Sequence, residues 1–393
     1  MSRFEEYDYV IIGAGIAGCA TAYFLSQHSK SILLIDKNEK IAFGASGAAG
    51  AFLSPLVGKP NAFKDLVTRA LSFSTSFYKS LDENLLENCG VCRIPKNEED
   101  KNKFESYKPY MDFEYEEMGE GYYFPIGSQI TPSEICTYLT KEIETKFNTN
   151  IEQLEKQEDN TWLLNDQIKA KKLILTTGAD TRLIKEKYFN IRAVWGQKID
   201  VLTNTKTDIN YHKECSVSKA IKVDENRYKV SLGATHHRFD CDKDICNYCV
   251  EVANINSCSR CYTSDITNKD SQKLIKLAND IVDLGEVEVI DVKIGPRASS
   301  VDYFPMVGKL VDSSRSIEEN PHIINGSFIK EDALAMHENL YVINGVGGRG
   351  FVLSPYLAKQ LVDSIVENKE IDKDITTYRL FKRWAKRLKN SKK

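Results

Sequence analysis

The chain has 393 residues, and 42% of them are hydrophobic, which supports a packed interior. A chain of this length is too long for one simple core, so we expect two intertwined domains or one large domain with insertions. The formal net charge is −3, yet residues 379–393 alone carry eight basic residues and no acid, so the preceding chain carries about −11 and the tail is a separate electrostatic unit. Ten cysteines, five of them between Cys241 and Cys261, argue against a disulfide framework spread over a secreted domain, and we expect a cytoplasmic protein.

A βαβ unit opens the predicted fold. Residues 7–12 are typical of a short buried strand, residues 16–27 of a helix and residues 31–35 of a second strand. The apolar run over this unit is broken by three glycines and preceded by acidic residues, so it is not a signal peptide. No other window approaches the length of a membrane span.

Further elements follow in chain order. Pro132 at a first turn and the spacing of Ile135, Leu139 and Ile143 predict a helix over residues 132–146. Strands are predicted at residues 150–154, 161–164, 173–176, 198–202, 228–232, 287–293 and 340–343, and a closing helix at residues 355–367.

A glycine motif lies at the end of the first predicted strand. Gly13, Gly15 and Gly18 form G-x-G-x-x-G, and Asp36 ends the second strand. The first glycine permits a tight turn, the second lets a pyrophosphate approach the backbone, and the third lets helix and strand pack closely; the acid can accept from a ribose 2′-hydroxyl. The glycine pattern alone is weak evidence, but in this order of elements it predicts dinucleotide binding, with FAD and NAD both open.

A stretch rich in small residues comes next. Residues 44–63 read GASGAAGAFLSPLVGKPNAF. The stretch resembles the segment that FAD enzymes of the D-amino-acid oxidase and glycine oxidase superfamily lay along the pyrophosphate and the isoalloxazine edge, where small side chains let the flavin approach main-chain N–H groups. Three later segments resemble the same superfamily in the same order: LILTTGAD at 173–180, GPRASSVDYFPMVG at 295–308 and NGVGGRGFVLSP at 344–355.

The resemblance implies FAD and an α/β fold, in which a Rossmann-like FAD-binding domain of the GR2 type is interleaved with an antiparallel-sheet substrate domain. The FAD-binding domain is expected at 1–85, 131–192 and 291–372, and the substrate domain at 86–130 and 193–290, with a Cys-rich insertion at 240–265 and a basic tail at 373–393. The implied cofactor-binding residues are Gly13, Ala14, Gly15, Ile16, Gly18, Asp36, Lys37, Gly44, Ala45, Ser46, Gly47, Ala49, Gly50, Ala51, Leu154, Thr177, Gly178, Arg297, Gly345, Gly347, Gly348, Arg349, Gly350, Phe351 and Val352.

Within the superfamily, most of residues 7–365 resembles the FAD-dependent C-terminal half of the MnmC enzymes, which finish 5-methylaminomethyl-2-thiouridine in tRNA. The most specific pieces are the 44–63 stretch, CGV at 89–91, DYFPMVG and GGRGF. The methyltransferase half of those enzymes has no counterpart here, so a separate methyltransferase is a candidate partner. A Cys-rich segment after SLGATHHRFD also departs from the pattern.

This resemblance implies a reaction. The substrate would be the carboxymethylaminomethyl group on a tRNA wobble uridine, whose α-carbon gives a hydride to flavin N5; the resulting imine hydrolyses to aminomethyluridine and glyoxylate, with oxygen as the electron acceptor. Arg297 matches the superfamily position that binds a carboxylate through a planar fork, Arg349 is the second candidate, and Lys59 and Gln197 are candidates to line the site. A surface position or an internal ion pair is the structural alternative for either arginine. Some relatives in the superfamily, the sarcosine oxidases, attach their flavin to a cysteine near the region that DYFP resembles. Residues 295–308 contain no cysteine, so we expect non-covalent FAD.

Four cysteines form a separate motif. Cys246, Cys249, Cys258 and Cys261 have the spacing C-x2-C, eight residues, C-x2-C, and four thiolates on two such knuckles can surround a structural zinc ion. An iron–sulfur centre, or cysteines without metal, are the alternatives.

The basic tail places Phe381, Trp384 and Leu388 on one predicted helical face and its basic residues elsewhere. Such a helix can dock by its apolar face, and its basic residues can bind the tRNA backbone. Two other functions remain open at this point: a glycine- or sarcosine-type small-amine oxidase that produces hydrogen peroxide, and a flavin- and zinc-containing RNA-binding protein without turnover.

Overall fold

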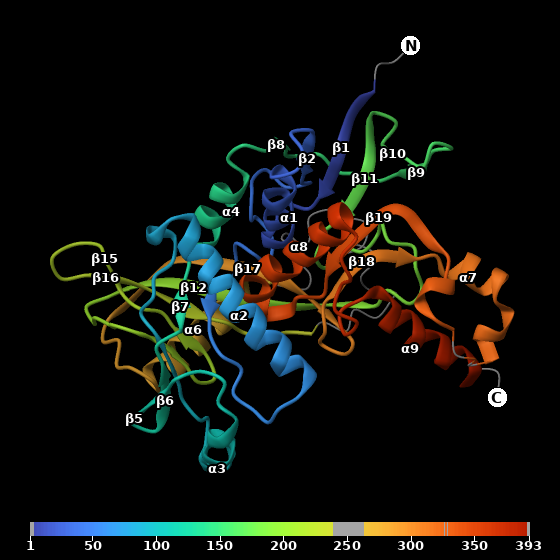
Figure 1. The fold of residues 1–393 in the computed structure, drawn as a ribbon. Helices are drawn as coiled ribbons and strands as arrows, with labels where there is room; N and C mark the ends of the chain where they lie inside the picture. The colour runs from blue at the N-terminus through green and yellow to red at the C-terminus, as the bar shows by residue number, and fades with distance from the viewer. Residues whose placement is uncertain (1–3, 239–262, 326, 328, 391–393) are drawn as a thin grey trace.

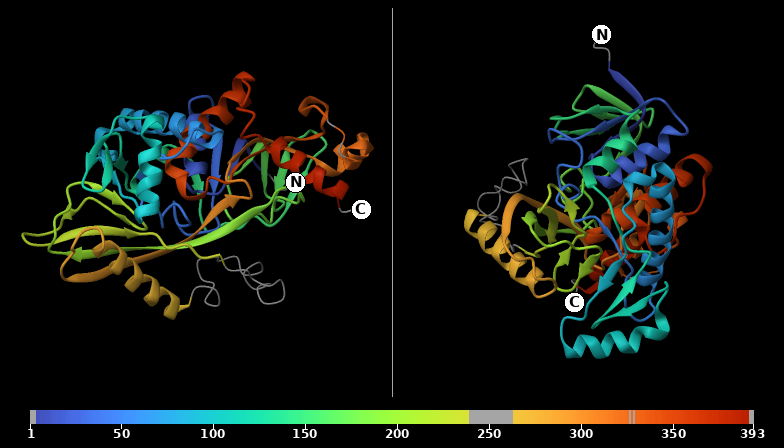
Figure 2. Two further views of the ribbon diagram at one scale, coloured as in Figure 1. Left: turned by 90° about the horizontal axis from the view of Figure 1, so that it is seen from below. Right: turned by 90° about the vertical axis from the view of Figure 1, so that its left-hand side faces the viewer.

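The computed structural model describes residues 4–238, 263–325, 327 and 329–390. In this part of the chain, one sheet has eight strands, a second has nine, and β3 (Phe52–Leu53) pairs with β7 (Ser128–Gln129). Most helices surround the first sheet, and α6 (Ser264–Asn279) lies on the face of the second sheet that is turned away from the first (Figures 1 and 2).

The first sheet is built on the βαβ unit that the sequence predicts. Strand β1 (Glu5–Ile12) runs parallel to β2 (Ile32–Ile35) on one side and to β11 (Ile168–Leu175) on the other, and α1 (Ile16–Ser26) connects β1 to β2. Successive side chains of β1 enter two different cores, so both faces of this sheet are buried. The sheet order is β18-β19-β11-β1-β2-β8, with β10 on β11 and β9 on β10; the added strands are β8 (Glu144–Lys146), β9 (Leu154–Lys156), β10 (Trp162–Leu164), β18 (Met306–Val311) and β19 (Met336–Asn344).

Helices cover both faces of the first sheet. The core on one face contains apolar residues of α1, α2 (Ala62–Leu81), α4 (Pro132–Thr140) and α8 (Gly350–Glu367). The core on the other face contains residues of α9 (Thr377–Asn390), and α7 (Ser313–Glu319) packs against it. Helix α3 (Glu98–Tyr107) lies at the far end of the molecule (Figure 1). Short 3₁₀ turns occupy Glu83–Leu85, Lys108–Tyr110, Pro321–Asn325, Glu331–Ala333 and Gly347–Arg349.

Two long antiparallel strands dominate the second sheet: β12 (Ile191–Thr203) and β17 (Val287–Ser300) pair along their full length (Figure 2). Leu274 and Ala278 of α6 share a core with Ile199 and Val201 of β12. Because side chains alternate along a strand, the even-numbered residues near the C-terminal end of β12 face away from α6. The order is β17-β12-β16-β14-β13-β4-β6-β5, with β15 on β16; these strands are β4 (Val91–Arg93), β5 (Glu116–Met118), β6 (Gly121–Phe124), β13 (Asn210–His212), β14 (Ser216–Val217), β15 (Ile221–Lys222) and β16 (Tyr228–Gly233).

The predicted fold class, a Rossmann-like α/β part combined with a largely antiparallel sheet, is confirmed. Several predicted elements differ in their bounds: β11, β12, β17, β19 and α8 are longer than predicted, and two other elements are shorter. The helix expected over 132–146 ends at Thr140, because residues 144–146 form β8 and pair with the edge of β2. The strand expected at 150–154 starts only at Leu154, since β9 takes its register from β10. Within the described residues, no helix is both long and apolar enough to cross a membrane.

Candidate functional site

A cleft of about 710 Å³ lies between the two sheets. Its walls come from the carboxyl ends of β1 and β11, the first turns of α1 and α8, the small-residue segment, and the neighbouring parts of β12 and β17. The cleft therefore joins the four segments that carry the sequence resemblance. The predicted residues that line it are Gly13, Gly15, Ile16, Asp36, Lys37, Gly44, Ala45, Ser46, Ala49, Gly50, Ala51, Thr177, Gly178, Arg297, Gly347, Gly348, Arg349, Gly350, Phe351 and Val352.

Glycine is required where β1 meets α1. Gly13 has φ +110°, and a Cβ at this position would lie 2.4 Å from the carbonyl oxygen of Thr176 on the neighbouring strand. A Cβ on Gly18 would lie 1.9 Å from the carbonyl oxygen of Gly13. The turn can therefore close, and α1 can pack on the strand, only with glycine at both positions.

Asp36 is held in place at the end of β2. Its carboxylate accepts a hydrogen bond from the backbone N–H of Ala14 (2.6 Å) and two from Asn38, through the backbone and the side-chain amide (2.8 Å each). Further along the same wall, Lys37 forms an ion pair of 2.6 Å with Asp180. Burial opposes the charge of Asp180, but hydrogen bonds from Arg182 and Lys37 outweigh it and keep the pKa of that carboxyl below its usual range.

The small-residue segment bridges the two sheets. The hydroxyl of Ser46 accepts from the backbone N–H of Ile16 (3.0 Å), which ties the segment to the first turn of α1. On its other side, a Cβ at Gly295 of β17 would lie 2.8 Å from Cα of Ala45. The segment thus fits between α1 and β17 because it carries almost no side chains.

These features fit a flavin dinucleotide. Gly15, which precedes α1, supplies no capping side chain. Apart from the N–H of Ile16, which donates to Ser46, the N–H groups of the first turn can therefore receive a pyrophosphate. Asp36 can accept from a ribose hydroxyl, and the exposed main chain of residues 44–51 leaves room for a flat ring system against it. The first turn of α8 presents a second helix N-terminus to the same cleft.

The end of the cleft at the second sheet is strongly cationic, and it holds Arg93, Arg297 and Arg349. Within the described residues, no carboxylate lies within 4 Å of a guanidinium nitrogen of Arg93 or Arg349. Burial lowers the pKa of Arg349 to about 10, and burial together with the charge of Arg349 lowers that of Arg93 to about 10. Both side chains stay charged at neutral pH, without an acidic partner in the described chain.

Two histidines line the same end. Nδ1 of His212 lies 2.6 Å from the hydroxyl of Ser216. Burial, followed by the charges of Arg93 and Arg349, lowers the pKa of His212 well below its usual value. Burial and the charge of Arg297 lower the pKa of His236 to about 4. Both imidazoles are therefore neutral at physiological pH.

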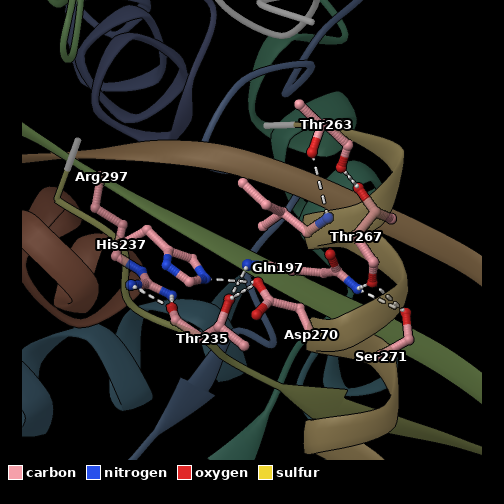
Figure 3. A network of polar contacts seen from close by, with 9 residues as sticks. Gln197, Thr235, His237, Thr263, Thr267, Asp270, Ser271 and Arg297 are labelled. Atoms are coloured by element: carbon pink, nitrogen blue, oxygen red, sulfur yellow. Dashed lines mark hydrogen bonds and ion pairs between the residues drawn. The ribbon is translucent and has the colours of Figure 1, made fainter. Parts of the chain in front are cut away.

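Arg297 belongs to a polar network that reaches α6 (Figure 3). Both terminal amino groups of Arg297 donate to the carbonyl oxygen of Thr235 (3.2 and 3.1 Å). The hydroxyl of Thr235 donates to the buried carboxylate of Asp270 (2.9 Å), which also lies 2.7 Å from Nε2 of His237. The orientation of Arg297 is thus connected to a carboxylate on the far side of the sheet.

The structure places two predicted catalytic candidates away from the cleft. Gln197 faces α6 and donates to the carbonyl oxygen of Thr267 (3.0 Å) and the hydroxyl of Ser271 (2.7 Å) (Figure 3). Lys59 is exposed and is not part of the cleft wall. This corrects the expectation that their side chains line the site, because alternation along β12 turns Gln197 to the opposite face.

Several predicted cofactor residues support the wall without lining it, namely Ala14, Gly18, Gly47 and Gly345. Leu154 lies in β9, and Thr149, Asn150 and Ile151 line the cleft instead. Sequence reasoning missed Arg93, His212 and His236. The CGV motif at residues 89–91 comes shortly before Arg93, but the residues around it do not indicate which face of β4 lines the cleft.

The predicted zinc ligands Cys246, Cys249, Cys258 and Cys261 lie outside the described residues, and the zinc site stays a prediction. The predicted apolar face of the tail is seen in part: Phe381 is buried against Tyr188, and Trp384 is half-buried beside it. At the start of α9, Arg379 forms a bidentate pair with Asp302 of the cleft wall (2.8 and 3.1 Å).

Comparisons with known proteins agree with this geometry. The family model described as FAD dependent oxidoreductase, DAO, matches residues 8–364. The chain is 25% identical over 376 residues to the tRNA 5-methylaminomethyl-2-thiouridine biosynthesis bifunctional protein MnmC of Campylobacter fetus, a match that covers 92% of this chain and 56% of that protein. It is 26% identical over 393 residues to the protein of the same name from Legionella pneumophila strain Lens, covering 93% and 55%. The chain thus spans about half the length of these curated relatives.

A solved structure shows the same fold. Glycine oxidase from Geobacillus kaustophilus superposes with a TM-score of 0.68 at 17% identity, covering 93% of this chain and 96% of that one. At this identity the likeness establishes the fold alone.

Proposed function

The chain belongs to the family of FAD-dependent oxidoreductases, and from this premise we propose that it oxidises the carboxymethylaminomethyl group of a wobble uridine in cytoplasmic tRNA. The observation that carries the proposal is the cationic end of the cleft, where Arg93, Arg297 and Arg349 converge beside the small-residue segment. The names of the similar curated proteins support tRNA as the carrier of the substrate.

The atoms and electrons of the proposed reaction balance with FAD, oxygen and water as the reactants besides the substrate. Bound FAD would supply the oxidation, taking up two electrons and the hydrogen of the α-carbon, and oxygen is the proposed final acceptor. The bond between the α-carbon and the nitrogen becomes an imine as the nitrogen loses its proton to solvent. Water then adds to the imine carbon, and the C–N bond breaks to give 5-aminomethyluridine and glyoxylate.

The protein's part is to bind and orient. Gly13, Gly15, Asp36 and the 44–51 segment would hold the dinucleotide without a covalent bond. The arginines would hold the carboxylate, which fixes the α-carbon next to it, and the neutral imidazoles of His212 and His236 leave the positive charge to those arginines. Holding the reacting carbon in one place removes much of the entropic cost of bringing it to the flavin.

The tail supplies a surface for the RNA in this proposal. Lys382, Lys386 and Arg387 are exposed on α9, while Phe381 anchors the helix. Exposed basic side chains on an anchored helix bind a phosphate backbone through charge, with little dependence on sequence.

The test is anaerobic mixing with tRNA from cells that accumulate 5-carboxymethylaminomethyluridine. The flavin absorbance should bleach, and glyoxylate and 5-aminomethyluridine should appear in equal amounts. Bleaching by free glycine or sarcosine but not by tRNA would instead establish the small-amine oxidase. Flavin that stays oxidised with all three would leave an RNA-binding protein without turnover. Flavin that stays with acid-precipitated protein would contradict the non-covalent assignment.

A further inference from the structure

We infer that Arg93, with Arg349, forms a prebuilt binding site for the substrate's carboxylate, and that Arg93 is the residue that sets the preference for an anionic substrate. The inference rests on the proposed function and goes beyond it, because neither the sequence motifs nor the family resemblance assigned a role to Arg93.

The two guanidinium groups converge on one residue of the cleft wall. Nη1 of Arg349 donates to the carbonyl oxygen of Ser54 (3.0 Å), and Nη1 of Arg93 makes a long contact of 3.4 Å with the hydroxyl of the same serine. The two arginines come from β4 and from the 3₁₀ turn that precedes α8, which lie far apart in the sequence. The fold therefore brings two like charges together at Ser54.

Arg93 has donors to spare. Its Nε is buried and has no hydrogen-bond partner. A buried donor left without a partner destabilises the folded chain, and two close positive charges without an acid add to that cost. A carboxylate in the cleft between the two arginines would accept from their terminal amino groups and would offset the repulsion between the two positive charges.

Arg297 differs from this pair in its bonding. Both of its terminal amino groups already donate to Thr235. The carboxylates that line the cleft are also engaged elsewhere: Asp36 with Ala14 and Asn38, Asp180 with Lys37 and Arg182, and Asp302 with Arg379. Within the described chain, none of the three lies within ion-pair distance of Arg93 or Arg349.

The first experiment titrates the oxidised flavoprotein with acetate and follows the change in flavin absorbance. Acetate should give a saturable change and acetamide none. In Arg93→Gln the apparent Kd for acetate should rise about tenfold or more, because a hydrogen bond to a charged group is lost. Arg93→Lys keeps the positive charge but lacks the planar guanidinium, so its apparent Kd for acetate should lie between those of the natural chain and Arg93→Gln. Inorganic phosphate that binds more tightly than acetate would overturn the carboxylate assignment in favour of an RNA phosphate.

The second experiment measures the thermal stability of the flavoprotein without acetate or tRNA. Arg93→Met removes an unpaired buried charge, so its Tm should equal or exceed that of the natural chain. The matched control is Arg379→Met, which breaks the pair with Asp302 and should lower Tm. Flavin content is measured in every variant, so that a weaker response to acetate is compared only among fully loaded proteins.

These readouts do not need tRNA, so the two proposals can fail separately. Acetate binding that depends on Arg93 in a protein that does not oxidise tRNA would reject the proposed function and keep the carboxylate site. Turnover of modified tRNA with unchanged KM and unchanged acetate affinity in Arg93→Gln would reject the carboxylate site and keep the function.

Discussion

Gly196 and Arg297 lie against each other on the neighbouring strands β12 and β17. A Cβ in place of the glycine hydrogen would lie 2.2 Å from Nη2 of Arg297 and 2.6 Å from the carbonyl oxygen of Thr235. The position of the arginine therefore depends on the absence of a side chain on the next strand.

Gly196→Ala should displace the Arg297 guanidinium from Thr235. Small displacements of a binding group can cost up to about 100-fold in rate, and we expect KM for the modified tRNA to rise about 10-fold or more while flavin stays bound. Steady-state kinetics and flavin content measure the two effects. Gly58→Ala is the control, because a Cβ there meets nothing within 4 Å. Unchanged KM in Gly196→Ala would contradict a role of Arg297 in substrate binding.

Gly13→Ala should weaken FAD binding. The φ of +110° is unfavourable for alanine by about 1–2 kcal/mol even before the contact with Thr176 is counted, so we expect an FAD affinity at least about tenfold lower. The ratio of flavin to protein absorbance after gel filtration reports this. Gly119→Ala also places alanine at a positive φ, +59°, with open space around the Cβ, and should keep its flavin. Equal flavin content in both variants would contradict a role of the Gly13 turn in FAD binding.

Asp270→Asn should loosen the substrate site from the far side of the sheet. The substitution keeps the size of the side chain but removes the charge that Thr235 and His237 contact. Asp270 is a positioning residue, so we expect KM to rise about 3- to 10-fold with a smaller change in kcat. Lys273→Gln, on the exposed side of α6, is the control. Equal changes in KM and kcat, with a lower Tm, would indicate a merely structural role.

Acetate should bind more tightly as the pH falls from about 7 toward 5. Burial and the charge of Arg297 lower the pKa of His236 to about 4 in the free protein. A bound carboxylate favours the protonated imidazole and so raises that pKa, which means that binding takes up protons and gains affinity at lower pH. His236→Gln should flatten the dependence. Affinity that falls over this range would place the anion away from His236.

Neutralising the tail should weaken tRNA binding through its charge alone. In the triple variant Lys382→Gln, Lys386→Gln, Arg387→Gln, the slope of log Kd against log salt should decrease by about 2–3, since each phosphate contact contributes slightly less than one unit. Matched substitutions of Lys101, Lys103 and Lys108, which pair with acids around α3, are the control. Identical slopes in both triple variants would contradict the tail surface.

The sequence predicted the parts of the fold that depend on local order. The strand-turn-helix around Gly13 and the acid at Asp36 lie where the motif requires, because the turn geometry and the parallel pairing follow from neighbouring residues. Helix α2 was not among the predicted elements. The edge strand β8 was predicted as part of a helix, since tertiary pairing decides between helix and strand at residues 144–146.

The candidate site was predictable only where a motif carried it. Arg297 and Arg349 lie in glycine-rich segments, whereas Arg93 and His212 lie in short strands that become neighbours only when β4 pairs with β13. Gln197 was a candidate to line the site, but the direction of its side chain depends on the register of its strand. One residue's shift along β12 turns a side chain from the cleft to α6.

The contact between Arg379 and Asp302 makes α9 an integral part of the enzyme's architecture and not a detachable tag. Cutting the chain before Arg379 would remove the counterion of Asp302, a half-buried acid on the cleft wall. It would also expose the apolar residues against which Phe381 packs. A truncated protein with poor activity would therefore report damage to the cleft as readily as loss of RNA contacts. Charge-removing point substitutions on the solvent side separate the two effects.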